Sequence, residues 1–256
     1  MSPHPTPRAE GRPLVLGHRG ASAEAPENTL AAFHRAMAQG ADGFELDVWR
    51  CASGEPVVIH DATTARTAGA GLDVRGSSLA RLRALDAGLW KGERFRGERI
   101  PALGEVLAAF PRAVVNVELK SDGVVDPRLA AAVARLLREL GAQARVVVSS
   151  FDYALLGAFR LLAPEVPAGL LFASDQRWEA RQRLGGMLLA PAAVHPELAL
   201  ASDLRVAEWI RRGLGVNVWT VDAPAEVERL CRAGATAVIS NVPGAAREAV
   251  RRATGR

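Results

Sequence analysis

The arrangement of apolar runs along the chain is the feature that most restricts its fold. Eight short runs have the composition of buried strands, and each is followed by a stretch with helical periodicity. Eight β/α units in a chain of about 250 residues are the number and size expected of a (β/α)8 TIM barrel. The pattern therefore predicts an α/β barrel whose strands are residues 14–19, 43–48, 114–120, 145–151, 168–172, 191–196, 215–221 and 236–241.

The alternation is interrupted once, after the second run. The turn-like segment CASGE leads into PVVIH at residues 56–60, which predicts a hairpin, although a parallel return also fits. Residues 61–100 are irregular and contain many glycines, so we expect a short insertion over one face of the barrel, with a helix near 77–85. The alternative fold is a doubly wound open sheet, but no glycine fingerprint follows the first run at the dinucleotide-binding spacing.

Composition excludes several classes of protein. Residues 1–13 are polar and proline-rich, so we expect a flexible tail, followed by a single barrel domain over residues 14–256. The tail lacks the apolar segment of a signal peptide, and no apolar run approaches the roughly 20 residues that span a bilayer. The net charge of +4 comes from scattered arginines, without a basic run. We therefore expect a cytoplasmic protein with no membrane insertion and no nucleic-acid partner.

Polar side chains gather where the predicted strands end. In a TIM barrel the active site lies at the carboxyl ends of the strands, so these side chains are expected to meet. Side chains two positions apart on a strand share a face, so each charged pair points the same way. The residues are His18 and Arg19 on the first strand, Glu45 and Asp47 on the second, Glu118 and Lys120 on the third, and Trp219 on the seventh.

Glu45, Asp47 and Glu118 would bring three carboxylates into one barrel mouth, where they repel one another and are costly to desolvate. One divalent cation resolves that conflict, and an all-oxygen ligand set without cysteine favours Mg²⁺ or Ca²⁺ over zinc. Each charged pair could instead be a salt bridge at a strand end. That simpler interpretation would suffice for one pair, but not for two pairs that accompany two histidines.

Two histidines are candidates for chemistry. His18 and His60 follow apolar runs and suit general acid–base catalysis, because the ordinary pKa of histidine lies near 6.5. His34 falls inside an amphipathic helical stretch, which favours a structural role. His195 ends a strand but has no obvious partner in the sequence, so its role stays open.

Arginine supplies nearly all of the positive charge, and Lys91 and Lys120 are the two lysines of the chain. Lysine is a compact point charge that arginine does not imitate. Lys120 ends an apolar run, which makes it the better functional candidate, and Arg19 lies at another strand end. A metal ion, an arginine and a lysine together suit a phosphoryl oxygen. With two histidines nearby, the residues predict a metal-assisted phosphoester hydrolase.

Six longer stretches carry a likeness to a known family. They cover nearly all of the chain after the tail and read GHRGASAEAPENTLAAF, GFELDVWRCASGEPVVIHD, LDAGLWKGERFRGERIPALGEVL, VNVELK, VSSFD and VNVWTVD. These stretches resemble the glycerophosphodiester phosphodiesterase family. The resemblance implies an eight-stranded β/α barrel that acts on a small-molecule substrate and hydrolyses glycerophosphodiesters to glycerol 3-phosphate and an alcohol.

The resemblance also implies a role for each matching residue. His18 and His60 would be the acid–base pair, with His18 favoured as the base, and the nucleophile would be water or the substrate's own 2-hydroxyl group. The remaining implied roles are Glu45, Asp47 and Glu118 as metal ligands, Arg19 and Lys120 on the phosphate, Glu27 as the residue that orients His18 or Arg19, and Trp219 as a wall of the substrate pocket.

The sequence departs from the family pattern at two places. Ala65 stands where the family often has aspartate, and Ser240–Asn241 stands where threonine–aspartate is common. Neither position has an assigned catalytic role, so we expect the differences to affect the rim of the pocket. The alternatives are a lysophospholipase D-like enzyme, a non-catalytic phosphate-binding barrel and a sugar-phosphate isomerase. The histidine pair counts against the binding protein, and the three carboxylates count against the isomerase.

Overall fold

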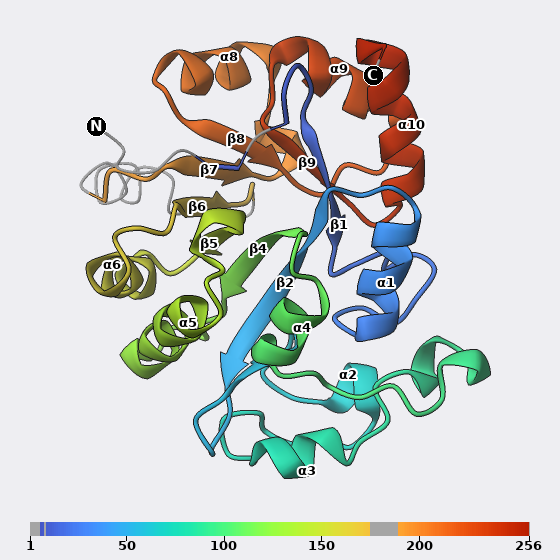
Figure 1. Cartoon of the computed structure of the whole chain (residues 1–256), viewed down its shortest axis with the longest axis vertical. Helices are drawn as coiled ribbons and strands as arrows, with labels where there is room; N and C mark the ends of the chain where they lie inside the picture. The colour runs from blue at the N-terminus through green and yellow to red at the C-terminus, as the bar shows by residue number, and fades with distance from the viewer. Residues whose placement is uncertain (1–5, 8, 175–188, 256) are drawn as a thin grey trace.

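Eight parallel strands close into a barrel in the computed structural model of the chain, which describes residues 6–7, 9–174 and 189–255 (Figure 1). Neighbouring strands follow the order β1, β2, β4, β5, β6, β7, β8, β9, and pairing of β9 with β1 closes the ring. The predicted TIM barrel is confirmed. The barrel strands are β1 Leu14–His18, β2 Gly43–Arg50, β4 Val114–Leu119, β5 Val146–Ser150, β6 Ala168–Phe172, β7 Ala193–Pro196, β8 Gly215–Val218 and β9 Ala237–Ser240.

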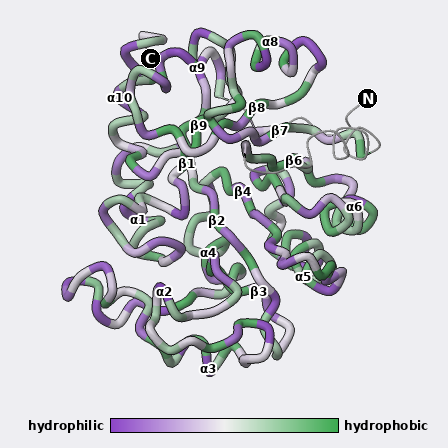
Figure 2. Tube along the Cα trace, turned by 180° about the vertical axis from the view of Figure 1, so that it is seen from behind, coloured by the Kyte–Doolittle hydropathy of each residue, from purple (hydrophilic) through white to green (hydrophobic). Residues whose placement is uncertain are grey.

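Helices cover the outside of the barrel, and their apolar residues pack against those of the strands. Hydrophobic and hydrophilic residues alternate along these helices (Figure 2). Phe33 stacks on Phe44 of β2 with ring centroids 4.2 Å apart. The sequence also predicts a helix over residues 174–184, after the fifth barrel strand, and this stretch lies outside the described residues except for its first residue. The helices of the barrel wall are α1 Leu30–Ala38, α4 Leu103–Ala109, α5 Pro127–Glu139, α6 Tyr153–Leu162, α8 Asp203–Arg211, α9 Pro224–Ala233 and α10 Pro243–Thr254.

Strand β2 continues past the barrel and forms the predicted hairpin with β3, Pro56–Val58. The pairing is antiparallel, with Val48 opposite Val58, so the parallel return is excluded. One further backbone hydrogen bond joins the two segments, from Ile59 N to Asp47 O at 3.0 Å. The hairpin therefore ties residue 60 directly to the strand that carries Asp47.

The segment 61–100 contains two short helices, α2 Ala65–Ala68 and α3 Leu79–Arg83, and two single 3-10 turns. α3 falls inside the predicted stretch 77–85, whereas α2 is too short to show periodicity and was not predicted. The segment lies at the opposite end of the molecule from α8 and α9 (Figure 1). It contacts the loop after β1, where Lys91 Nζ donates to Ser22 O at 2.7 Å. It therefore packs beside the carboxyl ends of the strands.

The division of the chain into a tail and a domain that starts at residue 14 stays a prediction. Within the described part of that tail, Arg12 forms a bidentate ion pair with Asp42, with Nη2 to Oδ1 at 2.7 Å. This pair fixes the residues immediately before β1. No helix within the described ranges is both long enough and apolar enough to cross a membrane.

Candidate active site

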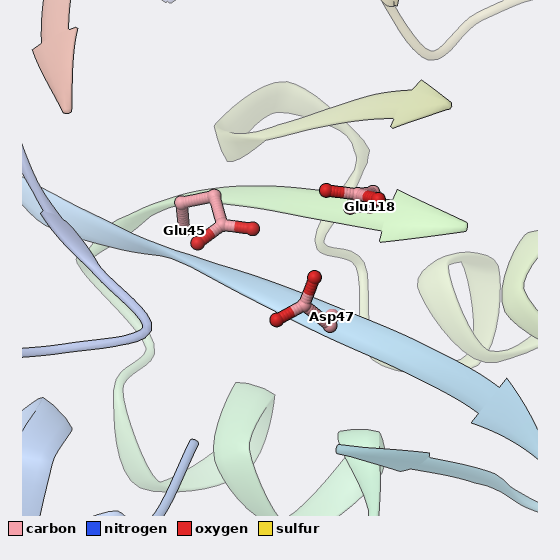
Figure 3. A group of neighbouring side chains, drawn as sticks. All are labelled: Glu45, Asp47 and Glu118. Atoms are coloured by element: carbon pink, nitrogen blue, oxygen red, sulfur yellow. The ribbon is translucent and has the colours of Figure 1, made fainter. Parts of the chain in front are cut away.

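Three carboxylates meet at the carboxyl end of the barrel. Glu45 and Asp47 come from β2, and Glu118 comes from β4, where it lies directly opposite Asp47 in the strand register. All three side chains are buried, and one oxygen from each lies within 4.8 Å of the others (Figure 3). Burial, together with the charge of Asp47, raises the pKa of Glu45 well above its ordinary value. Three carboxylates therefore lie together in a buried site, and the described groups beside them neutralise only part of their negative charge.

Two cations lie against these carboxylates. Lys120 Nζ lies 2.7 Å from Glu118 Oε1 and 3.4 Å from Asp47 Oδ1. Arg19 Nε lies 3.2 Å from Asp47 Oδ2. Burial opposes ionisation of Asp47, but Lys120 and Arg19 outweigh it and hold its pKa below the ordinary value, whereas burial raises that of Glu118 to about 7. Asp47 is therefore the carboxylate that stays charged most readily.

The donor set fits an oxygen-seeking divalent cation. Asp47 Oδ1 is buried and accepts no hydrogen bond from any residue that the structure describes. A buried carboxylate oxygen without such a partner is costly, and a cation ligated by this atom removes the cost. Glu45 and Glu118 add further oxygens, and neither histidine nor cysteine belongs to the cluster. Such a set suits Mg²⁺ or Ca²⁺.

Two residues near the carboxylates adopt the left-handed backbone conformation, which is uncommon outside glycine. Arg19 has φ 56° and Asn28 has φ 59°. The backbone conformation of Arg19 points its N–H at Glu45 Oε2, at 3.0 Å. That of Asn28 lets its Nδ2 donate to Asp47 Oδ2 at 2.8 Å. Strained backbone of this kind concentrates at functional sites, where the surrounding contacts maintain it.

The two histidines are held through the same ring nitrogen. Nδ1 of His18 lies 2.7 Å from Asn241 Oδ1, and Nδ1 of His60 lies 2.6 Å from Asp61 Oδ1. Burial lowers the pKa of both rings, and for His18 the charge of Arg19 adds to this effect. Each ring can therefore present Nε2 to a substrate.

Both histidines line one cavity of about 310 Å³ at the barrel mouth. Trp219 contributes an aromatic wall, and its ring meets that of Phe151 edge-on with centroids 5.7 Å apart. The lining combines charged and apolar groups, as a site for a small ligand with a charged head requires. The lining residues are His18, Arg19, Glu45, His60, Asn116, Glu118, Lys120, Phe151, Leu171, Ala173, Trp219 and Ile239.

Comparison with known sequences gives the decisive observation. The sequence model of the glycerophosphoryl diester phosphodiesterase family matches residues 18–245, nearly the whole barrel. The chain belongs to this family. The predicted family is thereby confirmed, and so is the assignment of the chain to this class of enzyme.

Individual members of the family match this chain along nearly their whole length. A glycerophosphodiester phosphodiesterase of Caldanaerobacter subterraneus subsp. tengcongensis is 37% identical over 236 residues, which cover 90% of this chain and 94% of that protein. A phosphodiesterase of Oleispira antarctica, solved in complex with the product sn-glycerol-3-phosphate, has a TM-score of 0.84 and 31% identity, with 93% and 97% of the two chains covered. A glycerophosphodiester phosphodiesterase of Agrobacterium tumefaciens has a TM-score of 0.78 and 30% identity, with 92% and 99% covered.

Glu27 lies against Arg19 rather than His18 in this family member. Arg19 Nη1 donates to Glu27 Oε1 at 2.9 Å, and Arg66 Nη1 donates to Glu27 Oε2 at 2.7 Å. Arg66 also holds Asp61, with Nε 2.7 Å from Oδ2. A chain of ion pairs therefore runs from Arg19 to the carboxylate beside His60.

Sequence reasoning missed several residues of this phosphodiesterase site. The sequence allows Asn28 or Thr29 as the cap of α1. Thr29 takes that place, with its hydroxyl accepting from Ala32 N at 3.3 Å, and Asn28 contacts Asp47 instead. Asp61 follows His60 directly, and that adjacency was the available signal. Asn241 was expected at the pocket rim, yet it contacts a histidine 223 positions away in sequence. No local pattern reveals such a contact.

His195 does not line the cavity. It is fully buried in the barrel interior, where Asn217 Nδ2 lies 2.9 Å from its Nε2. Burial lowers the pKa of the ring to about 3. The phosphodiesterase fold therefore keeps His195 as a neutral core residue, and its backbone carbonyl accepts from Trp219 Nε1 at 2.8 Å. This hydrogen bond holds the side chain of Trp219, which forms a wall of the cavity.

Proposed function

We propose that this chain hydrolyses glycerophosphodiesters to glycerol 3-phosphate and an alcohol, with a divalent cation at the carboxylate cluster. The observation that carries the proposal is the convergence of three buried carboxylates, two cations and two anchored histidines around one cavity. The names of its relatives, glycerophosphodiester phosphodiesterase, support the same substrate class. The product bound in the Oleispira antarctica structure supports a site for glycerol 3-phosphate.

Glu45, Asp47 and Glu118 are the residues that would hold the cation. When bound, a Mg²⁺ or Ca²⁺ ion offsets the carboxylate charge and acts as a Lewis acid toward a phosphoryl oxygen. Lys120 lies between Glu118 and Asp47 and offers a compact positive charge to the phosphate. Arg19, fixed by Glu27, offers guanidinium N–H groups to the same phosphate.

The surroundings of the two histidines support different roles. His60 donates from Nδ1 to the Asp61 carboxylate, and this contact raises the pKa of the ring against the lowering that burial causes, which suits a general acid. His18 faces the Asn241 amide instead, which carries no charge, so its ring suits a neutral base. His18 Nε2 would take the proton of the nucleophile, either water or the substrate's 2-hydroxyl group. His60 Nε2 would give its proton to the oxygen of the departing alcohol.

The test is an assay of purified protein with glycerophosphocholine, in which a coupled enzyme measures glycerol 3-phosphate release. The proposal expects release that EDTA abolishes and that added Mg²⁺ or Ca²⁺ restores. His18→Ala and His60→Ala should each lower turnover by about 10²- to 10⁴-fold. Matched controls replace His34, which lies on α1 away from the cavity lining.

Each contrary result points to a specific error. Release that persists after exhaustive metal removal would reject the metal site but keep the reaction. Release from lysophosphatidylcholine and not from glycerophosphocholine would favour the lysophospholipase D-like alternative. Absence of release from either substrate with metal present would favour a barrel that only binds phosphate ligands.

A further inference from the structure

The side chain that contacts His18 is itself held in place by a carboxylate. Asn241 Nδ2 donates to Asp222 Oδ2 at 2.7 Å, and the backbone N of Asn241 donates to Asp222 Oδ1 at 2.8 Å. Ser240 Oγ adds a third hydrogen bond to Asp222 Oδ1, at 2.9 Å. Asp222 lies in the loop after β8 and does not line the cavity. It therefore reaches the site only through its neighbours.

These hydrogen bonds fix the orientation of the Asn241 amide. An ionised carboxylate can only accept, so the NH₂ group of Asn241 must face Asp222 and its oxygen must face away. The reverse orientation would place the amide oxygen against a carboxylate oxygen. Ser22 Oγ donates to the same Asn241 oxygen at 2.8 Å, which agrees with this orientation.

The fixed amide in turn decides where His18 carries its proton. Asn241 Oδ1 has no hydrogen to give, so the 2.7 Å contact requires His18 Nδ1 to be the donor. In a neutral imidazole the other nitrogen, Nε2, then holds the lone pair. His18 lines the cavity, so this lone pair is available to a bound nucleophile.

We propose that Asp222 and Asn241 are positioning residues that lock His18 in its Nδ1–H tautomer and so keep Nε2 free to accept a proton. The catalytic consequence rests on the proposed function, in which His18 removes the proton of the nucleophile. The tautomer itself follows from the hydrogen bonds alone. After proton uptake at Nε2, the Nδ1–H bond to Asn241 remains, so no group has to reorient during the step.

Two substitutions separate this mechanism from a merely structural effect. In Asp222→Asn, the new amide oxygen still accepts from the Asn241 backbone and from Ser240, so its NH₂ group faces Asn241. The Asn241 amide must then flip, which presents NH₂ to His18 Nδ1 and inverts the tautomer. In the reciprocal double variant Asp222→Asn with Asn241→Asp, every hydrogen bond re-forms. The carboxylate that then stands at position 241 accepts both from the amide at position 222 and from His18.

The experiment records ¹H–¹⁵N correlations of the imidazole rings in histidine-labelled full-length protein at about pH 8, where an ordinary histidine is neutral. Spectra are taken with EDTA and again with Mg²⁺, and a His18→Gln variant assigns the signals. Turnover of glycerophosphocholine is measured on the same samples. The control is Asp203→Asn, which removes an exposed carboxylate of α8 that pairs with Arg229 of α9.

The proposal expects the Nδ1–H tautomer of His18 in the unsubstituted protein and in the double variant, and the Nε2–H tautomer in Asp222→Asn. It expects kcat of Asp222→Asn to fall by about 10- to 100-fold with KM nearly unchanged, with recovery in the double variant and no change in Asp203→Asn. A Nε2–H or mixed tautomer in the unsubstituted protein would overturn the proposal. So would an unchanged tautomer in Asp222→Asn, even if the substrate itself proves wrong.

Discussion

His60 Nδ1 lies 2.6 Å from the carboxylate of Asp61, the next residue along the chain. If His60 is the general acid, its effect on the rate is largest when the oxygen of the leaving group is strongly basic. We therefore predict that His60→Ala lowers turnover about 10²- to 10⁴-fold with glycerophosphocholine, but much less with a glycerophospho-p-nitrophenyl ester, whose phenolate leaves without a proton. His18→Ala should impair both substrates. Turnover of each variant is measured on both substrates. If His60→Ala lowers turnover equally on the two, His60 is not the general acid.

Burial and the charges of Asp47 and Glu118 oppose the ionisation of Glu45. Glu45→Gln keeps an oxygen for the Arg19 backbone N–H but removes one repelling charge. Without metal, the variant should unfold at the same temperature as the parent protein or higher. With metal at 100 times its Kd, the parent should gain about 2.7 kcal/mol and the variant almost nothing. Thermal unfolding measures both effects, and Glu208→Gln on α8 should behave as the parent does.

Lys120 compensates two buried carboxylates at once, and its own side chain is 13% exposed. Lys120→Met should therefore lower the free energy of unfolding by about 3 to 5 kcal/mol without metal, because the carboxylates lose their partner. Added Mg²⁺ should restore part of that stability. Lys91→Met is the matched control, and it should cost about 1 kcal/mol, because it removes one hydrogen bond to Ser22 O and an exposed cation–π contact with Trp90. Denaturant unfolding measures both variants, and equal losses of unfolding free energy in Lys120→Met and Lys91→Met would contradict the prediction.

Burial lowers the pKa of His195 to about 3 in the folded barrel, against about 6.5 in the unfolded chain. Between these two values the unfolded chain binds a proton that the folded chain does not, so stability falls as pH decreases below about 6.5. From pH 7 to 5.5, metal-free parent protein should lose about 1.3 kcal/mol more than His195→Gln, whose side chain has no such titration. Denaturant unfolding at the two pH values tests this, and parallel losses would show that His195 is not the titrating group.

The barrel was predictable because its signals are local. Each apolar run and the helical stretch after it can be recognised within about 30 residues, and barrel closure follows from their number. Boundaries were less accurate where backbone pairing ends before the composition changes. The run predicted to end at residue 221 forms regular strand only as far as Val218, and the second strand extends to Arg50 because the hairpin prolongs it.

The candidate site was predictable as far as strand ends determine it. His18, Glu45, Asp47 and Glu118 come together because parallel strands end at one edge. The groups that orient them come from loops, where spacing carries no comparable signal. Asn241 shows this clearly, because its contact with His18 depends on the pairing of β9 with β1, and its contact with Asp222 depends on the pairing of β9 with β8.

The hairpin of β2 and β3 has an implication for how this enzyme can change over time. Asp47 and His60 share one rigid ribbon, joined by the bond from Ile59 N to Asp47 O and by that from Trp49 Nε1 to His60 O at 3.0 Å. Asp61 and Arg66, which hold His60 and Glu27, follow this ribbon directly, and residues 67–100 begin only after them. Insertions, deletions or exchanges in that segment can therefore remodel access to the barrel mouth while the spacing between His60 and the carboxylates is kept. Selectivity and chemistry are thus open to separate evolution within one domain.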